Sequence, residues 1–221
     1  MRLAVFNGSP RGKQSNTKIL MEHFCRGFIE NNDNSVDVAY LNRSGETEQH
    51  VELFKKADHI ILAFPLYTDA MPGIVKHFIE ALASTAGIRK PDMGFVIQSG
   101  FPEPIHSRYV GRYMEKLAQR LGCPHTGTVI RGGGEGIQMQ PLWMTRKLFR
   151  SFYELGRKYA ATGRFNEKII RKLAPREQMS PIRRLAFRFM MATGLANMFW
   201  NMKLKQNKAF EKRFAHPFKK I

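Results

Sequence analysis

Short apolar runs alternate with longer amphipathic stretches over the first 160 residues of the chain. The runs have the length and residue types of strands, and they lie at 3–6, 36–41, 59–64, 93–98 and 126–131. The stretches have apolar residues at helical spacing, and they lie at 19–28, 50–57, 72–83, 106–121 and 142–159. The run at 59–64 is almost continuously apolar, which is typical of a parallel strand buried on both faces. This alternation predicts an α/β fold with a flavodoxin-like, doubly wound, five-stranded parallel sheet of order 2-1-3-4-5.

The alternation stops after Gly163. Two further helices are expected near 166–174 and 181–200, separated by Pro175 and Pro181, and a polar, basic end follows. We therefore expect one domain over residues 1–163 and a basic helical C-terminal extension over residues 164–221.

Positive charge is concentrated in this extension. The chain has a formal net charge of +18, and residues 164–221 hold 15 of its 36 Lys and Arg but only 3 of its 18 Asp and Glu. Such a field favours anionic partners, among them nucleic acid, anionic lipid, acidic proteins and phosphorylated cofactors. The extension and the domain therefore need separate explanations.

An apolar stripe runs along the second helix of the extension, with Arg184 and Arg188 beside it. The stripe comprises Leu185, Phe189, Ala192, Ala196 and Phe199. Packing on the domain or in a dimer is the favoured reading, a peripheral membrane contact through 181–200 is second, and nucleic acid is least favoured. The sequence alone leaves these alternatives open.

Cysteine usage and the N-terminus bear on location and on metal sites. Cys25 and Cys123 form no CxxC pair, so neither a disulfide framework nor a cysteine-ligated metal site is expected. The N-terminal run is too short for a signal peptide, and no apolar stretch reaches the roughly 18 residues that span a bilayer. These features predict a cytoplasmic protein, with membrane association through the extension left open.

The loops after the strands carry the candidate chemistry, because a doubly wound sheet binds ligands at the carboxyl ends of its strands. The loop GSPRGKQSNT (residues 8–17) combines glycines, hydroxyl groups and a helix N-terminus, which suits a phosphate. An ordinary surface loop that caps a helix is the alternative. The GxxxxGK[ST] spacing of a P-loop is absent.

The loop FPLYTDAMPG (residues 64–73) follows the third strand and could hold a flat ring against Pro65 and Tyr67. Packing alone would explain Tyr67 equally well. Asp69 in this loop and His106 beyond the next could touch a substrate, although a solvated or structural role is favoured for each.

The two loops together resemble the NADPH-dependent FMN reductase group of the flavodoxin-like superfamily, through GSPRGKQSNT and FPLYTDAMPGIVKHFIE. The resemblance covers roughly residues 1–160. It implies bound FMN with its phosphate at Ser9, Arg11, Ser15, Asn16 and Thr17. It implies contacts with the flavin ring at Pro65, Leu66, Tyr67 and Thr68. Ser99, Gly100 and Phe101 would cover the other side of the ring. The resemblance points less specifically to Gly133 and Gly134 at the neighbouring rim. The chain has no cysteine cluster between the second and third strands, so the iron–sulfur variant of this group is excluded.

The activity implied by the resemblance is an FMN-dependent NAD(P)H oxidoreductase that passes electrons from NADPH or NADH to a small acceptor such as a quinone or a flavin. The flavin carries the chemistry, so no catalytic side chain is expected. Backbone N–H groups of Leu66, Tyr67 and Thr68 are expected to stabilise charge on the reduced ring. No GxGxxG motif follows any strand, so the nicotinamide would stack on the flavin.

Two other functions stay open. The first is a flavodoxin-like electron-transfer protein that a partner reduces, without NAD(P)H oxidation of its own. The second is a basic binding protein that uses the fold as a scaffold. A homodimer is expected from the resemblance only.

Overall fold

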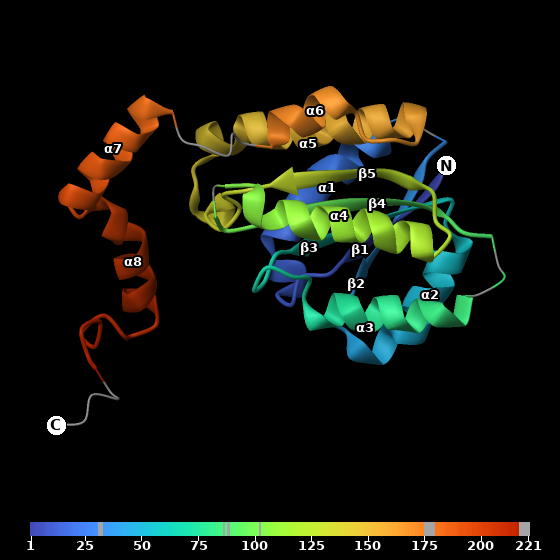
Figure 1. The fold of residues 1–221 in the computed structure, drawn as a ribbon, viewed down its shortest axis with the longest axis horizontal. Coiled ribbons are helices and arrows are strands. Elements are labelled where there is room, and N and C mark those ends of the chain that lie inside the picture. Colours follow the sequence, from blue (N-terminus) through green and yellow to red (C-terminus); the bar gives the residue numbers. More distant parts are fainter. Residues whose placement is uncertain (31–32, 86, 88, 102, 175–179, 217–221) are drawn as a thin grey trace. The chain divides into compact units, whose positions relative to one another are not determined.

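A five-stranded parallel sheet forms the centre of the domain in the computed structural model, which describes residues 1–216 except 31–32, 86, 88, 102 and 175–179 (Figure 1). Its strands are β1 (Arg2–Asn7), β2 (Ser35–Tyr40), β3 (His59–Pro65), β4 (Asp92–Gln98) and β5 (His125–Arg131). Their order is β2-β1-β3-β4-β5, and every neighbouring pair is parallel. The predicted fold class and strand order are confirmed.

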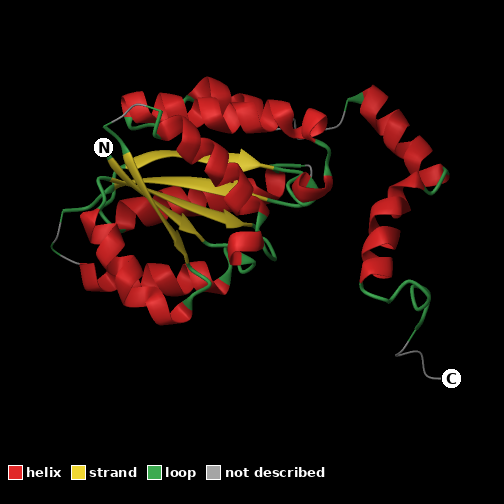
Figure 2. Ribbon diagram, turned by 180° about the vertical axis from the view of Figure 1, so that it is seen from behind, coloured by secondary structure: helices red, strands yellow, loops and turns green. Residues whose placement is uncertain are grey.

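Helices cover both faces of this sheet (Figure 2). One face carries α1 (Asn16–Phe28), α5 (Leu142–Thr162) and α6 (Glu167–Leu173), and the other carries α2 (Thr47–Lys56), α3 (Gly73–Ala81) and α4 (Ile105–Arg120). Successive strand residues point to opposite faces, so Val5 packs in the α1–α5 cluster while Phe6 packs in the cluster under α2, α3 and α4. Both clusters are almost fully buried, because the central strands are apolar on both sides.

Two glycines bring the backbones of α1 and α5 into contact. A Cβ atom on Gly156 would lie 1.9 Å from the carbonyl oxygen of Phe24, and one on Gly27 would lie 2.0 Å from that of Tyr153. Neither position has room for a side chain, so these glycines set how closely the two helices approach.

The described chain divides into two compact units, Met1–Glu177 and Gln178–Ile221. The helix α6 lies in the first unit, where it contacts α5 and β5. The sequence placed this helix in the extension, and the predicted domain boundary after residue 163 stays a prediction. Among the described residues, no helix is both long enough and apolar enough to cross a membrane.

The second unit contains α7 (Pro181–Ala192) and α8 (Met198–Gln206), separated by a 3₁₀ turn at Leu195–Asn197. The continuous helix predicted over 181–200 is therefore wrong. Gly194 adopts the left-handed conformation, with φ of +72°, directly after the last turn of α7. Glycine takes this conformation without a Cβ penalty, which is why helices often end at one.

A buried histidine makes the stability of the first unit sensitive to acid. His50 is only 4% exposed and lies edge-on to the rings of Phe6 and Phe78 at 6.4 Å each. Burial lowers its pKa in the folded protein below the ordinary value of 6.5. The unfolded chain therefore binds the proton more readily, and stability is lost as the pH falls through about 6.5 toward the folded pKa.

We expect the free energy of unfolding to decrease between pH 7.5 and pH 5.5, in part through His50. His50→Leu should show a smaller decrease, as measured by urea unfolding at both pH values. The exposed His77 on α3 offers a control, since His77→Gln should keep the pH dependence of the wild type. An unchanged pH dependence in His50→Leu would contradict this assignment.

Candidate functional site

The loops that follow β1, β3, β4 and β5 lie at one edge of the sheet. Backbone hydrogen bonds extend the strand pairing past the strand ends, from Gly8 N to Ala63 O (2.7 Å), Leu66 N to Gln98 O (2.7 Å) and Ser99 N to Arg131 O (2.9 Å). Each loop is therefore held against its neighbour where it leaves the sheet. All twelve sequence-predicted site residues lie at this edge, at the end of β3, in these loops or in the first turn of α1.

The loop after β5 also bonds to the loop after β1. The amide Nδ2 of Asn16 donates to the carbonyl oxygen of Gly134 at 2.7 Å, and the guanidinium of Arg11 pairs with the Glu135 carboxylate at 3.3 Å. A Cβ atom on Gly134 would lie 2.2 Å from Oε1 of Gln98, so the loop passes close to the end of β4. Sequence reasoning missed Glu135 and these contacts; the glycine-rich run 132–136 was the available signal.

Ser15 caps the N-terminus of α1. Its Oγ accepts a hydrogen bond from the backbone N–H of Lys18 at 3.1 Å and donates one to the carbonyl oxygen of Gly12 at 2.7 Å. Asn7, which the sequence analysis did not single out, donates from Nδ2 to the same Oγ at 3.2 Å. Asn7 Oδ1 also accepts from the N–H of Ser9 at 2.9 Å, so this residue connects the end of β1 to the helix cap.

Thr17 carries a hydroxyl group that is buried without a hydrogen-bond partner. The side chain is 1% exposed, and among the described residues its Oγ1 has no partner. The N–H groups of Asn16 and Thr17 lie in the first turn of α1, where a helix supplies no acceptor and its dipole favours an anion. A phosphate would accept from all three donors, so these residues fit one.

Asn16 adds a second requirement. Its Oδ1 is also buried and has no partner among the described residues, and because it is an acceptor an anion does not satisfy it. A ligand that brings a hydroxyl donor next to its phosphate would meet the needs of Asn16 and Thr17 together.

The loop after β3 forms a tight two-residue hairpin. Tyr67 and Ala70 exchange two backbone hydrogen bonds of 3.0 Å each. Thr68 and Asp69 between them have φ of +50° and +58°, a left-handed conformation that a β-branched residue such as Thr68 rarely adopts. Such strain persists only where the surrounding structure holds it, and it is common at ligand sites. Tyr67 is 43% exposed on this hairpin, next to the buried end of β3 at Pro65.

The hairpin also corrects one expectation. The N–H of Leu66 donates to Gln98 and that of Tyr67 donates to Ala70, so neither is available to a ligand. Of the three amides expected to stabilise charge on a ring, Thr68 N–H is the one that donates to no acceptor among the described residues.

The loop after β3 meets the start of α4 through Asp69 and His106. The Nδ1 atom of His106 lies 3.6 Å from Oδ1 of Asp69, and its ring lies 5.1 Å from the ring of Phe101. Phe101 is 63% exposed, and the hydroxyl of the buried Ser99 donates to its carbonyl oxygen at 3.1 Å. Two residues that the sequence analysis treated separately therefore share one edge of the site, beside the exposed Gly100.

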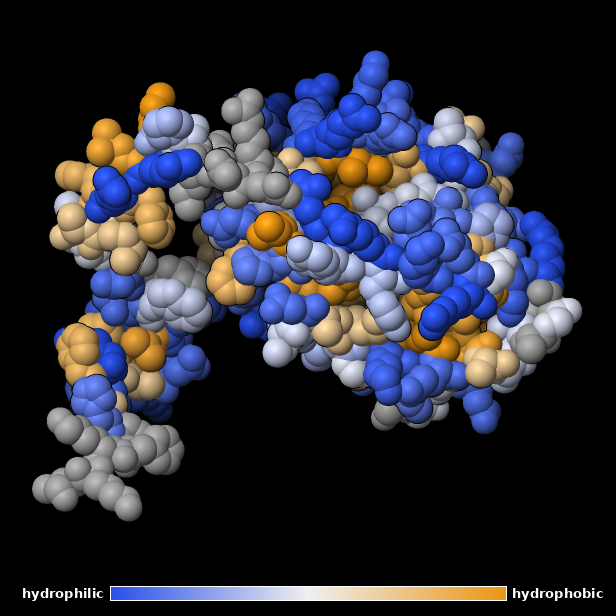
Figure 3. Space-filling view, viewed as in Figure 1, coloured by the Kyte–Doolittle hydropathy of each residue, from blue (hydrophilic) through white to orange (hydrophobic). Residues whose placement is uncertain are grey.

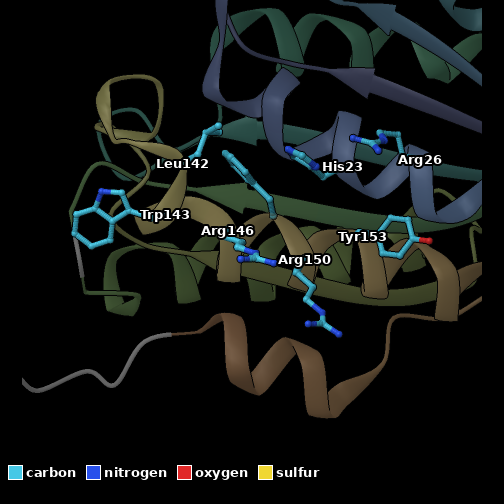
Figure 4. Close-up of a pocket in the computed structure, with 8 residues that line it drawn as sticks. His23, Arg26, Leu142, Trp143, Arg146, Arg150 and Tyr153 are labelled. Atoms are coloured by element: carbon cyan, nitrogen blue, oxygen red, sulfur yellow. The ribbon is translucent and has the colours of Figure 1, made fainter.

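An open groove of about 800 Å³ lies elsewhere, along α1 and α5 (Figure 4). Its lining comprises His23, Arg26, Leu142, Trp143, Arg146, Phe149, Arg150 and Tyr153. His23 stacks on Phe149 with ring centroids 4.2 Å apart, and burial lowers the pKa of His23. None of the sequence-predicted site residues lines this groove, so it is a separate surface feature.

Comparison with known proteins finds a matching family profile and a related enzyme sequence. A family profile described as "Flavodoxin-like fold" matches residues 1–89. The chain is 31% identical over 156 residues to an NADPH azoreductase of Bacillus sp. (strain OY1-2), which covers 64% of this chain and 86% of that protein.

Two solved structures share the fold at low sequence identity. An FMN-dependent NADH-azoreductase from Bacillus anthracis str. Ames Ancestor, in complex with FMN, is 14% identical with a TM-score of 0.56, covering 72% of this chain and all of that one. An NAD(P)H:quinone oxidoreductase from Methanothermobacter marburgensis is 14% identical with a TM-score of 0.57, covering 72% of this chain and 95% of that one.

Proposed function

The chain belongs to the flavodoxin-like NAD(P)H oxidoreductase family that includes the Bacillus NADPH azoreductase, and from this membership we propose that it passes electrons from NADPH or NADH through bound FMN to a small acceptor. The class of activity is that of an NAD(P)H-dependent flavoprotein oxidoreductase. Within this class, the proposed electron acceptor is a quinone, a flavin or a similar small conjugated molecule.

One observation carries the assignment of the cofactor to this edge of the sheet. In the part of the chain that the structure describes, the hydroxyl of Thr17 is buried without a partner at the start of α1, beside two first-turn amides and the unpartnered Oδ1 of Asn16. The phosphate of FMN offers acceptors to the donors, and its ribityl hydroxyl groups offer donors to Asn16. Leaving these groups unsatisfied costs stability, so their arrangement favours a ligand of this chemistry.

When bound, FMN supplies the hydride and electron chemistry, and the chain supplies placement and electrostatics. Thr17 and the first turn of α1 bind the phosphate, with Ser9 and Ser15 beside them and Arg11 adding positive charge. Pro65 and Leu66 at the end of β3 hold one side of the ring together with Tyr67 and Thr68 of the strained hairpin. Ser99, Gly100 and Phe101 cover the other side.

The acceptor would meet the exposed aromatic side chains at this rim. Tyr67 and Phe101 are both large and exposed, and they come from neighbouring loops. Flat aromatic rings favour stacking with flat, conjugated acceptors. Asp69 and His106 lie at the same rim and are placed to contact polar groups of the acceptor. The cytoplasmic location and the homodimer stay predictions.

The test is an absorption spectrum of the purified protein, followed by anaerobic addition of NADPH. We expect flavin bands that bleach promptly, and steady NADPH oxidation once a quinone is added. Flavin bands that persist with NADPH would favour the electron-carrier alternative. If no flavin is present and added FMN does not bind, the proposal is wrong.

A further inference from the structure

The second unit exposes large apolar side chains and has no buried residue among those described. Ile182, Leu185, Phe189, Met198 and Trp200 are each more than three-fifths exposed, at 81%, 70%, 65%, 69% and 62%. Every described residue from 180 to 216 is at least partly exposed, so this segment forms no core of its own. A surface of this kind needs an apolar partner, because leaving it in water is unfavourable.

Most of the surface of α7 is apolar, and a pair of arginines interrupts it on one side. Ile182, Leu185 and Phe189 follow at spacings of three and four, which places them on one face. Arg184 and Arg188 are spaced by four and lie beside this face, about a third of a turn around the helix, with the exposed Phe187 and Met191 near them. Figure 3 shows apolar and strongly hydrophilic side chains side by side over α7. A helix that exposes aromatic and aliphatic residues with cations beside them is typical of segments that lie in a membrane interface.

Charge decides between the partners that could cover this surface. Residues 178–221 contain ten Lys and Arg against one Asp or Glu, for a net charge of +9. The rest of the chain contains 26 against 17 and is also at +9. The domain of the same chain, or of a second copy, therefore repels the segment. Nucleic acid would neutralise the cations but leave the apolar face in water.

We propose that residues 181–206 bind the surface of an anionic phospholipid bilayer. The apolar face of α7 enters the boundary between headgroups and acyl chains, and the cations of α7 and α8 contact the anionic headgroups. This inference goes beyond the proposed oxidoreductase function and does not depend on it.

The experiment uses the full-length protein with its cofactor and vesicles of two compositions, phosphatidylcholine alone and phosphatidylcholine with phosphatidylglycerol. The chain has two tryptophans, so Trp143→Phe leaves Trp200 as the single tryptophan, and excitation at its red edge avoids the tyrosines. We expect co-sedimentation and a blue shift of Trp200 emission with the anionic vesicles only, both reduced by added salt.

A matched pair of double variants separates this surface from general hydrophobicity. Leu185→Glu with Phe189→Glu should weaken vesicle binding by more than about tenfold, because it places charge on the apolar face. Tyr109→Glu with Tyr113→Glu, at exposed aromatic positions on α4, should leave binding within about twofold, because exposed substitutions outside a contact change little. Both pairs should keep NADPH-dependent flavin reduction, so loss of membrane binding is distinguishable from failure of the proposed activity.

Three results would overturn the inference. The first is equal binding to neutral and anionic vesicles, and the second is no vesicle binding together with tight binding to duplex DNA. The third is a dimer that the Leu185→Glu, Phe189→Glu variant dissociates, without vesicle binding, since a second copy would then cover the apolar face.

Discussion

Thr17→Val is expected to weaken FMN binding by about ten- to a hundredfold, because it removes one hydrogen bond to a charged group. The substitution keeps the size and branching of the side chain, so the packing at the start of α1 should not change. The hydroxyl that it removes is buried and has no partner in the described structure. The FMN-free protein should therefore be as stable as the wild type or more stable, which is the opposite of what a structural threonine would show.

FMN fluorescence quenching on titration into FMN-free protein measures the affinity, and urea unfolding of the same protein measures the stability. Thr85→Val is the matched control, because Thr85 is equally buried but its hydroxyl donates to the carbonyl oxygen of Leu82 at 2.6 Å. We expect this control to lose stability and to keep FMN affinity. If Thr17→Val loses stability and binds FMN normally, Thr17 has a structural role and the proposed phosphate site is wrong.

Gly156→Ala is expected to destabilise the first unit by about 3 kcal/mol, at the upper end of what overpacking usually costs. Its Cβ would lie 1.9 Å from the carbonyl oxygen of Phe24 and 3.0 Å from the backbone nitrogen of Phe28. Both are backbone atoms, so no side-chain rotation relieves the clash and α1 and α5 must move apart. For a unit of this size, the melting temperature should fall by about 10 °C.

Thermal and urea unfolding measure this loss, with Gly73→Ala as the control. Gly73 begins α3, and a Cβ atom there would have nothing within 4 Å. Alanine favours a helix more than glycine does, so the control should be neutral or slightly stabilising. A Gly156→Ala protein with the stability of the wild type would show that the α1–α5 contact yields readily to an added methyl group.

The folding pattern of the first unit could be predicted from the sequence because it depends on local periodicity. Apolar runs such as the one at 59–64 have to be buried on both faces, and each is followed by an amphipathic stretch that covers the sheet. Five such units favour one doubly wound order. Ser15 at the start of α1 could be predicted for the same reason, since capping is a local interaction. The resemblance in the first two loops named the family and its cofactor.

Contacts between distant loops depended on the tertiary structure. The hydrogen bond between Asn16 and Gly134 joins residues 118 apart in the sequence. The approach of His106 to Asp69 depends on where the loop after β3 and the start of α4 lie in space. The pairing of β3 with β4 placed the amide of Leu66 in an internal bond, and the hairpin did the same for the amide of Tyr67. The requirement for glycine at positions 27 and 156 becomes evident only when α1 and α5 are packed together. Periodicity thus determined which elements form and which face is buried, whereas the partners of individual polar atoms followed from the three-dimensional arrangement of the loops.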